Sequence, residues 1–195
     1  EARGLPTRRP SRQGVLARRR GARPALGRYV AVADVRESGQ PVRGLVADMS
    51  DEVCYAYAKA FLGAVAANCR SVVVGHDLRP SSPRIAAACV QAIRDSGCEP
   101  LFVGALPTPA LAYFCSLRAS PGIIVTGSHI PFDRNGIKFY RADGEIDKAD
   151  EAAMMDAAVN VPSPLSPAAL PPADAEALRA YSERYVGFFG EGRLA

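Results

Sequence analysis

Strand-like and helix-like segments alternate along most of this sequence. Short apolar runs, typical of buried strands, occupy residues 71–75, 101–103, 122–126 and 136–140. Segments with apolar residues at helical spacing occupy residues 53–65, 83–96, 107–117 and 147–159. Strands that alternate with helices through short connections predict an α/β fold. We expect a three-layer α/β/α sandwich around a mixed, mostly parallel sheet, with residues 136–140 as its edge strand.

The positive charge of the chain is concentrated near its beginning. The net charge is +4, but residues 1–28 hold nine arginines and one acid, so the remainder is net negative. These residues show no helical or strand periodicity, and we predict that residues 1–41 are a disordered or artefactual basic head. A non-catalytic α/β module with a nucleic-acid-binding arm is therefore one alternative for the chain. No aromatic residue precedes Tyr29 to stack on bases, so we expect no nucleic-acid partner.

Proline marks the other end of the alternating region. Residues 161–173 contain five prolines, a density that permits neither helix nor strand and predicts a linker. Asp174 would then cap a helix over residues 175–189. We expect residues 42–160 to form the main domain, and residues 174–195 to be the first helix of a truncated second domain.

Cysteine spacing and hydropathy indicate a cytoplasmic protein. The five cysteines form no C-x-x-C pair, and Cys54 and Cys89 fall on apolar helix faces, which favours reduced thiols over a disulfide or zinc framework. No apolar run approaches the ~18 residues that a membrane span needs. No apolar segment follows the arginines, as a secretory signal would require. We expect no membrane partner.

The loop after residues 122–126 is the most informative segment for function. In open α/β sheets, ligands bind at the carboxyl ends of the strands. Ser128 stands just beyond this apolar strand, and Gly127 before it allows a tight turn that presents the hydroxyl. His129 follows directly. These residues are candidates for group transfer.

A lysine lies shortly after that loop. Asn135-Gly136 is a tight-turn signal that would return the chain and bring Lys138 back toward Ser128. Lys138 is one of only three lysines beside 21 arginines. Its amine is suited to proton transfer, which a guanidinium is not.

Two other loops contribute charged groups to the same predicted sheet edge. Asp77 and Arg79 follow the strand at residues 71–75, just ahead of a helix N-terminus that favours anions. Arg43 lies in a predicted flexible loop before the first helix. Hydroxyl, imidazole, amine and guanidinium groups without an acidic cluster suit a phosphorylated ligand. Asp77 and Arg79 are therefore candidates for substrate or phosphate binding.

A serine hydrolase that uses Ser128 as nucleophile and a histidine as base is the second alternative. Hydrolases of this kind need a G-x-S-x-G elbow and a third, orienting acid. Residues 126–130 read T-G-S-H-I and lack the second glycine. The sequence therefore disfavours this alternative.

The loop sequences resemble those of a known family. Residues 126–131, T-G-S-H-I-P, with N-G-I-K at residues 135–138, resemble the phosphoserine loop of the α-D-phosphohexomutases, the phosphomannomutase/phosphoglucomutase family. That loop reads roughly T-A-S-H-N-P and then N-G-x-K. Residues 75–79, G-H-D-L-R, are similar to the family's G-R-D-x-R, and residues 44–160 look like its first domain throughout. Gly127 stands in place of the usual Ala, and Ile130 in place of the usual Asn.

The resemblance implies a role for each candidate residue. Ser128 would be phosphorylated, and its phosphate would help to bind Mg²⁺ with further ligands from beyond residue 195. His129 matches the histidine that follows the serine, Lys138 the general acid/base, and Arg43 the arginine of the family's G-T-S-G-x-R-G loop.

The implied reaction is an isomerisation, in which a phosphoryl group is exchanged between C1 and C6 of a hexose phosphate through the phosphoserine. Mannose and glucose phosphates are both open as substrates. We expect the full-length protein to be a phosphomutase and the 195-residue chain alone to be inactive, because such transfer needs groups from several domains around the sugar.

Overall fold

A mixed sheet forms the centre of the molecule. The computed structural model describes residues 28–31 and 42–190. The strand order is β2 (Arg43–Leu45), β6 (Arg134–Arg141), β5 (Gly122–Val125), β3 (Ser71–His76) and β4 (Glu99–Ala105), with β7 (Gly144–Glu145) paired to β6. Strand β3 is parallel to β4 and β5, whereas β6 is antiparallel to β5, β2 and β7. Only β6 therefore runs against the others, which confirms the mixed, mostly parallel sheet.

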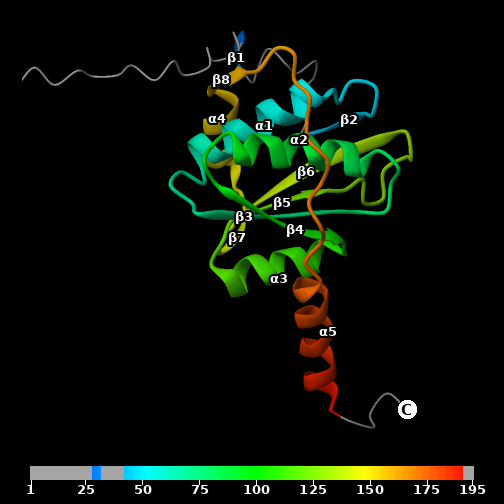
Figure 1. The fold of residues 1–195 in the computed structure, drawn as a ribbon. Helices are drawn as coiled ribbons and strands as arrows, with labels where there is room; N and C mark the ends of the chain where they lie inside the picture. The colour runs from blue at the N-terminus through cyan, green and yellow to red at the C-terminus, as the bar shows by residue number, and fades with distance from the viewer. Residues whose placement is uncertain (1–27, 32–41, 191–195) are drawn as a thin grey trace, which may run out of the picture.

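Helices cover both faces of this sheet (Figure 1). On one face lie α1 (Asp51–Ala64), α2 (Ser82–Arg94) and α4 (Lys148–Met155), and on the other lie α3 (Thr108–Arg118) and α5 (Glu176–Phe189). Alternate strand residues enter the two cores: Val72 and Val74 pack beneath α1 and α2, whereas Val73 packs against α3. The three-layer sandwich is confirmed.

Local sequence signals mark the ends of α1, α2 and α3, whereas the N-cap of α5 is Ala175 and not the predicted Asp174. Ser50 caps α1 by accepting a hydrogen bond from the backbone N–H of Val53 at 3.3 Å. Proline lies in the first turn of α2 and of α3, where its missing N–H costs nothing. Ala119 ends α3 in the left-handed conformation.

Strand β6 is not at the edge of the sheet, so that prediction is wrong. It spans eight residues and is paired on both sides, with β5 on one and with β2 and β7 on the other. The short strands β2 and β7 together cover its second side, and each contributes only two or three residues. Their brevity hides them from a search for strand-length apolar runs.

A small separate sheet joins the two ends of the described domain. Strand β1 (Arg28–Ala31) pairs antiparallel with β8 (Ala158–Val161). The prediction of disorder is wrong for these four residues, because their backbone finds a partner in β8; the rest of residues 1–41 lies outside the described residues. Helix α4 ends at Met155, not Val159, because Val159 and Val161 alternate with exposed residues in strand fashion.

The proline-rich segment after β8 runs as an extended strap along α2 toward α5 (Figure 1). Leu165 and Leu170 pack against the larger core, and the N–H of Asp174 donates to the carbonyl of Phe102 at 2.8 Å. Helix α5 then packs on α3 through buried Ala177. Among the described helices, none has the length and apolar character to cross a membrane.

Candidate functional site

Ser128 lies at the carboxyl end of β5 in a strained loop. Its φ is 50°, a left-handed conformation that a residue with a side chain rarely adopts. Its backbone N–H donates to Thr126 Oγ1 at 3.1 Å, and the N–H of Ile130 donates to the carbonyl of Gly127 at 3.0 Å. The side chain of Ser128 is exposed. Strain of this kind persists only where neighbouring groups hold the backbone.

Asp77 holds the loop from the adjacent strand β3. One carboxylate oxygen accepts from the Ser82 hydroxyl at 2.5 Å and from the Arg79 backbone N–H at 3.0 Å. The other accepts from the N–H of Gly127 at 2.8 Å. Burial raises the pKa of Asp77, but these hydrogen bonds and one from Thr126 stabilise the charged form, and its pKa lies below the usual value.

Arg79 holds the same loop through backbone carbonyls. Its Nη1 donates to Pro131 at 2.7 Å and Arg134 at 3.0 Å, and its Nη2 donates to Ile130 at 2.6 Å and Ser128 at 3.4 Å. Its Nε lies 3.5 Å from the Asp77 carboxylate. All three guanidinium nitrogens are therefore engaged within the chain. The geometry favours a positioning role for Arg79 over the phosphate-binding role predicted from the sequence.

Gly127 makes room for this guanidinium. A Cβ at residue 127 would lie 2.1 Å from Arg79 Nε and 2.2 Å from Cζ, far inside contact distance. Gly127 therefore allows the closest approach of Arg79 to the loop backbone. This gives a physical reason for glycine at residue 127, where the T-A-S-H-N-P pattern has alanine.

Asn135 does not form the tight turn that the sequence predicts. It is fully buried in β6, and its side-chain amide donates to Ser81 at 2.8 Å and Ser82 at 2.9 Å. Its amide oxygen accepts from the N–H of Gly136 at 2.8 Å. The Asn-Gly pair thus joins β6 to the start of α2, and the chain instead turns between Ser128 and Asp133.

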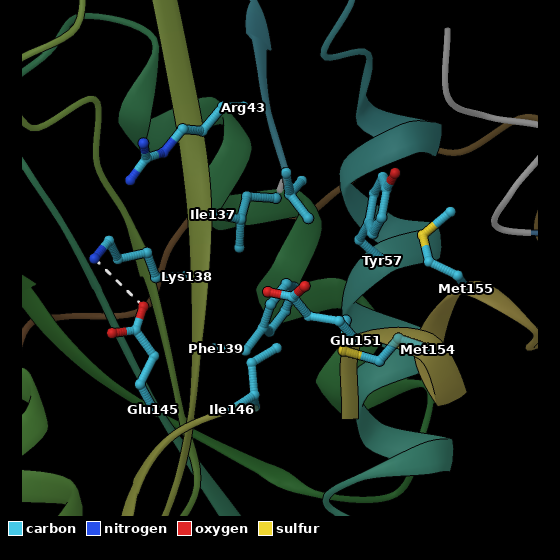
Figure 2. A pocket seen from close by; sticks show the side chains of 11 residues that line it. Arg43, Tyr57, Ile137, Lys138, Phe139, Glu145, Ile146, Glu151, Met154 and Met155 are labelled. Atoms are coloured by element: carbon cyan, nitrogen blue, oxygen red, sulfur yellow. Dashed lines mark ion pairs between the residues drawn. The ribbon is translucent and has the colours of Figure 1, made fainter. Parts of the chain in front are cut away.

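Arg43 and Lys138 lie on one face of the sheet, next to each other (Figure 2). Arg43 belongs to strand β2, not to a flexible loop, and is paired with Gly136. A Cβ at Gly136 would lie 2.9 Å from Arg43 Cγ, so the arginine stem crosses β6 at that glycine. Gly136 and Lys138 share a strand face because they are two residues apart. The structure therefore brings these two cations together.

Glu145 is a neighbour of Lys138 that is absent from the sequence-based candidates. Lys138 Nζ lies 3.4 Å from Glu145 Oε1, as the dashed line in Figure 2 shows. The side chains are 27% and 52% exposed, respectively. The signal that could have found Glu145 is the β6–β7 hairpin, which pairs it with Tyr140, two residues beyond Lys138.

A cavity of about 200 Å³ opens beside β6, but it is not the site that the loops form. Arg43 and Lys138 line one side of it, whereas Tyr57, Met154 and Met155 from α1 and α4 line the other (Figure 2). No residue of the Ser128 loop lines this cavity. Its largely apolar far side does not suit a sugar phosphate.

The candidate residues thus form two groups. Ser128, Asp77 and Arg79 are joined by hydrogen bonds, and exposed His129 adjoins Ser128. Arg43 and Lys138 form the second group on β2 and β6. Within residues 28–31 and 42–190, no hydrogen bond or ion pair joins Ser128 to Lys138. A ligand at the sheet edge would have to connect the two groups.

The described residues do not form a magnesium site by themselves. No group of three or more His, Cys, Asp or Glu side chains in the described part of the chain could hold a metal ion. The Asp77 carboxylate, which holds the Ser128 loop, already accepts hydrogen bonds on both oxygens. Mg²⁺ prefers several oxygen ligands, and Ser128 could contribute one when phosphorylated.

The sequence matches one domain of a known protein family. Residues 35–161 match the family model for phosphoglucomutase/phosphomannomutase, alpha/beta/alpha domain I. A phosphomannomutase of Salmonella muenchen is 47% identical over 115 residues, which cover 58% of this chain and 24% of that protein. A phosphoglucosamine mutase of Pelotomaculum thermopropionicum is 41% identical over 100 residues, covering 48% of this chain and 22% of that protein.

A solved structure supports the same comparison. A phosphoglucomutase/phosphomannomutase family protein from Burkholderia thailandensis superposes with a TM-score of 0.54 and 26% sequence identity. The match covers 64% of this chain and 29% of that chain. In each of these comparisons, the chain spans between about a fifth and a third of the relative's length.

Proposed function

This chain belongs to the phosphoglucomutase/phosphomannomutase family, and we propose that Ser128 carries the phosphoryl group of a phosphohexomutase. The observation that supports this most is the Ser128 loop. Its backbone is tied to Asp77 and Arg79, while the hydroxyl stays exposed at the carboxyl end of β5. A rigid backbone with a free hydroxyl is what a residue needs in order to accept and donate a group repeatedly.

In the proposed reaction, a hydroxyl oxygen of a hexose phosphate attacks the phosphorus of phospho-Ser128. The bond from phosphorus to Ser128 Oγ breaks as the bond to the sugar oxygen forms, giving a bisphosphorylated sugar. The intermediate then turns over and returns its other phosphoryl group to Ser128. The net result is isomerisation between the C1 and C6 phosphates.

Lys138 and Arg43 would serve this transfer from the neighbouring strands. In its uncharged form, Lys138 Nζ takes the proton of the attacking sugar hydroxyl, and it returns that proton to the departing sugar oxygen in the second half-reaction. Arg43 supplies a fixed positive charge for the phosphate that is not being transferred. Exposed His129, which follows Ser128 directly, would donate a hydrogen bond to the serine phosphate.

Family members generally use Mg²⁺, which would neutralise charge on the phosphate of Ser128. Its other ligands would come from outside the described residues. For this reason, and because the match spans about a quarter of the length of the phosphomannomutases, we expect the 195-residue chain alone to show little or no turnover. Mannose phosphate is the first substrate to test, since both relatives at 47% identity are named phosphomannomutase.

The test compares turnover of mannose and glucose 1-phosphates by the complete protein with and without the Ser128→Ala substitution. We expect Ser128→Ala to lower turnover on the order of 10⁴-fold or more, because the group carrier is lost. Ser116→Ala, which alters an exposed serine of α3, is the matched control and should retain full turnover. Undiminished turnover in Ser128→Ala would overturn the proposal, as would covalent labelling of Ser128 by a fluorophosphonate without mutase activity.

A further inference from the structure

Two cysteines far apart in the sequence lie side by side at the opposite edge of the sheet. Cys69 Sγ lies 3.4 Å from Cys98 Sγ. The Cys98 thiol also lies 3.1 Å from the carbonyl oxygen of Cys69, to which it can donate a hydrogen bond. Both residues are half-buried. The sequence offers no C-x-x-C signal for this pair, because 29 positions separate the two residues.

The fold brings the two cysteines together through β3 and β4. Cys69 precedes β3 and Cys98 precedes β4, and these parallel strands place Ser71 opposite Glu99. The N–H of Glu99 donates to the carbonyl of Arg70 at 2.9 Å, so the two strand entrances are held in register. The pair therefore lies at the amino ends of the strands, whereas Ser128 lies at a carboxyl end.

Solvent reaches this pair and does not reach the others. Cys69 and Cys98 both line a cavity of about 780 Å³. The remaining cysteines, Cys54, Cys89 and Cys115, are 0%, 0% and 1% exposed. A small reagent therefore meets only the Cys69–Cys98 pair in the folded chain.

We propose that Cys69 and Cys98 form a redox-sensitive dithiol that a small-molecule disulfide oxidises to an intramolecular disulfide. One protein thiolate attacks a sulfur of the reagent, breaks its S–S bond and releases one reagent thiol. The second protein thiolate attacks the protein-bound sulfur, forms the Cys69–Cys98 bond and releases the second reagent thiol. Two electrons pass to the reagent, and the two protons of the protein thiols end on the released thiols.

The neighbourhood of the pair shapes how this reaction proceeds. Burial, together with the neighbouring Cys98 thiol, raises the pKa of Cys69 to about 12, so little of its thiolate is present at neutral pH. Disulfide formation also requires the two sulfurs to move from 3.4 Å apart to the S–S bond length of about 2 Å. We therefore expect oxidation to be slow at neutral pH and faster as the pH rises.

The test uses the folded 195-residue chain with one equivalent of dithiodipyridine. We expect the wild-type chain to release two thiopyridones per reagent molecule, to retain no reagent and to lose two hydrogens by intact mass. Peptide mapping should then show a Cys69–Cys98 disulfide. Cys69→Ser and Cys98→Ser should each release half as much thiopyridone and keep one reagent group. The denatured wild-type chain, with all five thiols accessible, is the control for the reagent.

Two results would overturn the proposal. One is a wild-type chain that retains reagent as a stable mixed disulfide, which would mean that the second thiol cannot reach the first. The other is a folded wild-type chain whose five thiols stay unreactive while the denatured chain reacts, which would make both cysteines ordinary packing residues. Because neither readout depends on mutase turnover, the proposal stands or falls independently of the proposed function.

Discussion

The Ser128 loop and the Arg43–Lys138 face flank the same sheet end, but they are held in opposite ways. Arg79 and Asp77 bind the backbone around Ser128, so the position of the hydroxyl is set by the fold. Lys138, by contrast, has one ion pair within the described part of the chain, to the half-exposed Glu145. The contrast suggests a division of labour in which the proposed phosphoryl carrier, Ser128, is fixed, while the amine proposed for proton transfer, Lys138, can follow a substrate that turns over.

The largest expected effect is on turnover in a variant of Lys138, which should hardly change in stability. In the complete protein, Lys138→Met should lower turnover by about 10²–10⁴-fold, because it removes the proton-transfer group. The free energy of unfolding should change by less than ~1 kcal/mol, because an ion pair that solvent reaches contributes little. Lys148→Met, which breaks the surface pair with Glu151, should change neither. Steady-state turnover and urea unfolding measure the two quantities, and unchanged turnover in Lys138→Met would remove the lysine from the mechanism.

Arg79 should show the reverse pattern in the isolated chain. Arg79→Met leaves several loop carbonyls and Asp77 without their charged partner, and should lower the free energy of unfolding by about 2–3 kcal/mol. Arg179→Met, at an exposed ion pair of α5 with Glu183, should cost less than ~0.5 kcal/mol. Urea unfolding compares the two. Equal losses would show that the Ser128 loop is no more firmly held than an ordinary surface.

Gly127→Ala tests whether Arg79 needs the space at Gly127. The added methyl group would displace the guanidinium, and we expect a loss of about 1 kcal/mol in the free energy of unfolding. In an Arg79→Met background the same change should cost almost nothing, so a double-mutant cycle should show positive coupling. Gly63→Ala, where an added Cβ meets nothing within 4 Å, should not destabilise α1. Additive losses at Gly127 and Arg79 would contradict the packing argument.

The pH dependence of stability should show the smallest effect. The pKa of Asp77 is lower in the folded chain than its ordinary value of 3.8. Its contribution to stability is therefore complete above that ordinary value and is lost as the pH falls through the lower, folded-state pKa. Urea unfolding between about pH 6 and pH 2.5 should show a shallower acid loss for Asp77→Asn than for the wild type. Identical slopes would mean that the loop does not stabilise the Asp77 carboxylate.

Local sequence signals predicted what depends on side-chain pattern. The apolar spacing located α1, α2, α3 and the central strands, because those elements bury one regular face. Strands β1 and β8 were missed because neither is recognisable without the other: their pairing joins residues more than a hundred positions apart. Helix α4 was extended too far for the same reason, since Val159 belongs to β8.

The same distinction applies to the residues of the candidate site. Ser128, Lys138 and Arg43 could be selected as candidates because their side-chain chemistry is visible in the sequence. The role of Arg79 could not, since its partners are backbone carbonyls, which every residue carries. Asn135 misled for a related reason: Asn-Gly is a frequent turn pair, but here the amide is buried against two serines of the α2 N-terminus.

The most direct measurement is the location of phosphate on the chain after incubation of the complete protein with a hexose 1,6-bisphosphate. Intact mass and phosphopeptide mapping should find one phosphoryl group, on Ser128, that is absent from Ser128→Ala and present in Ser116→Ala. Addition of hexose 1-phosphate should remove it from the wild-type protein. Phosphate on another residue, or a phosphate on Ser128 that no sugar phosphate removes, would contradict the assignment of Ser128 as the phosphoryl carrier.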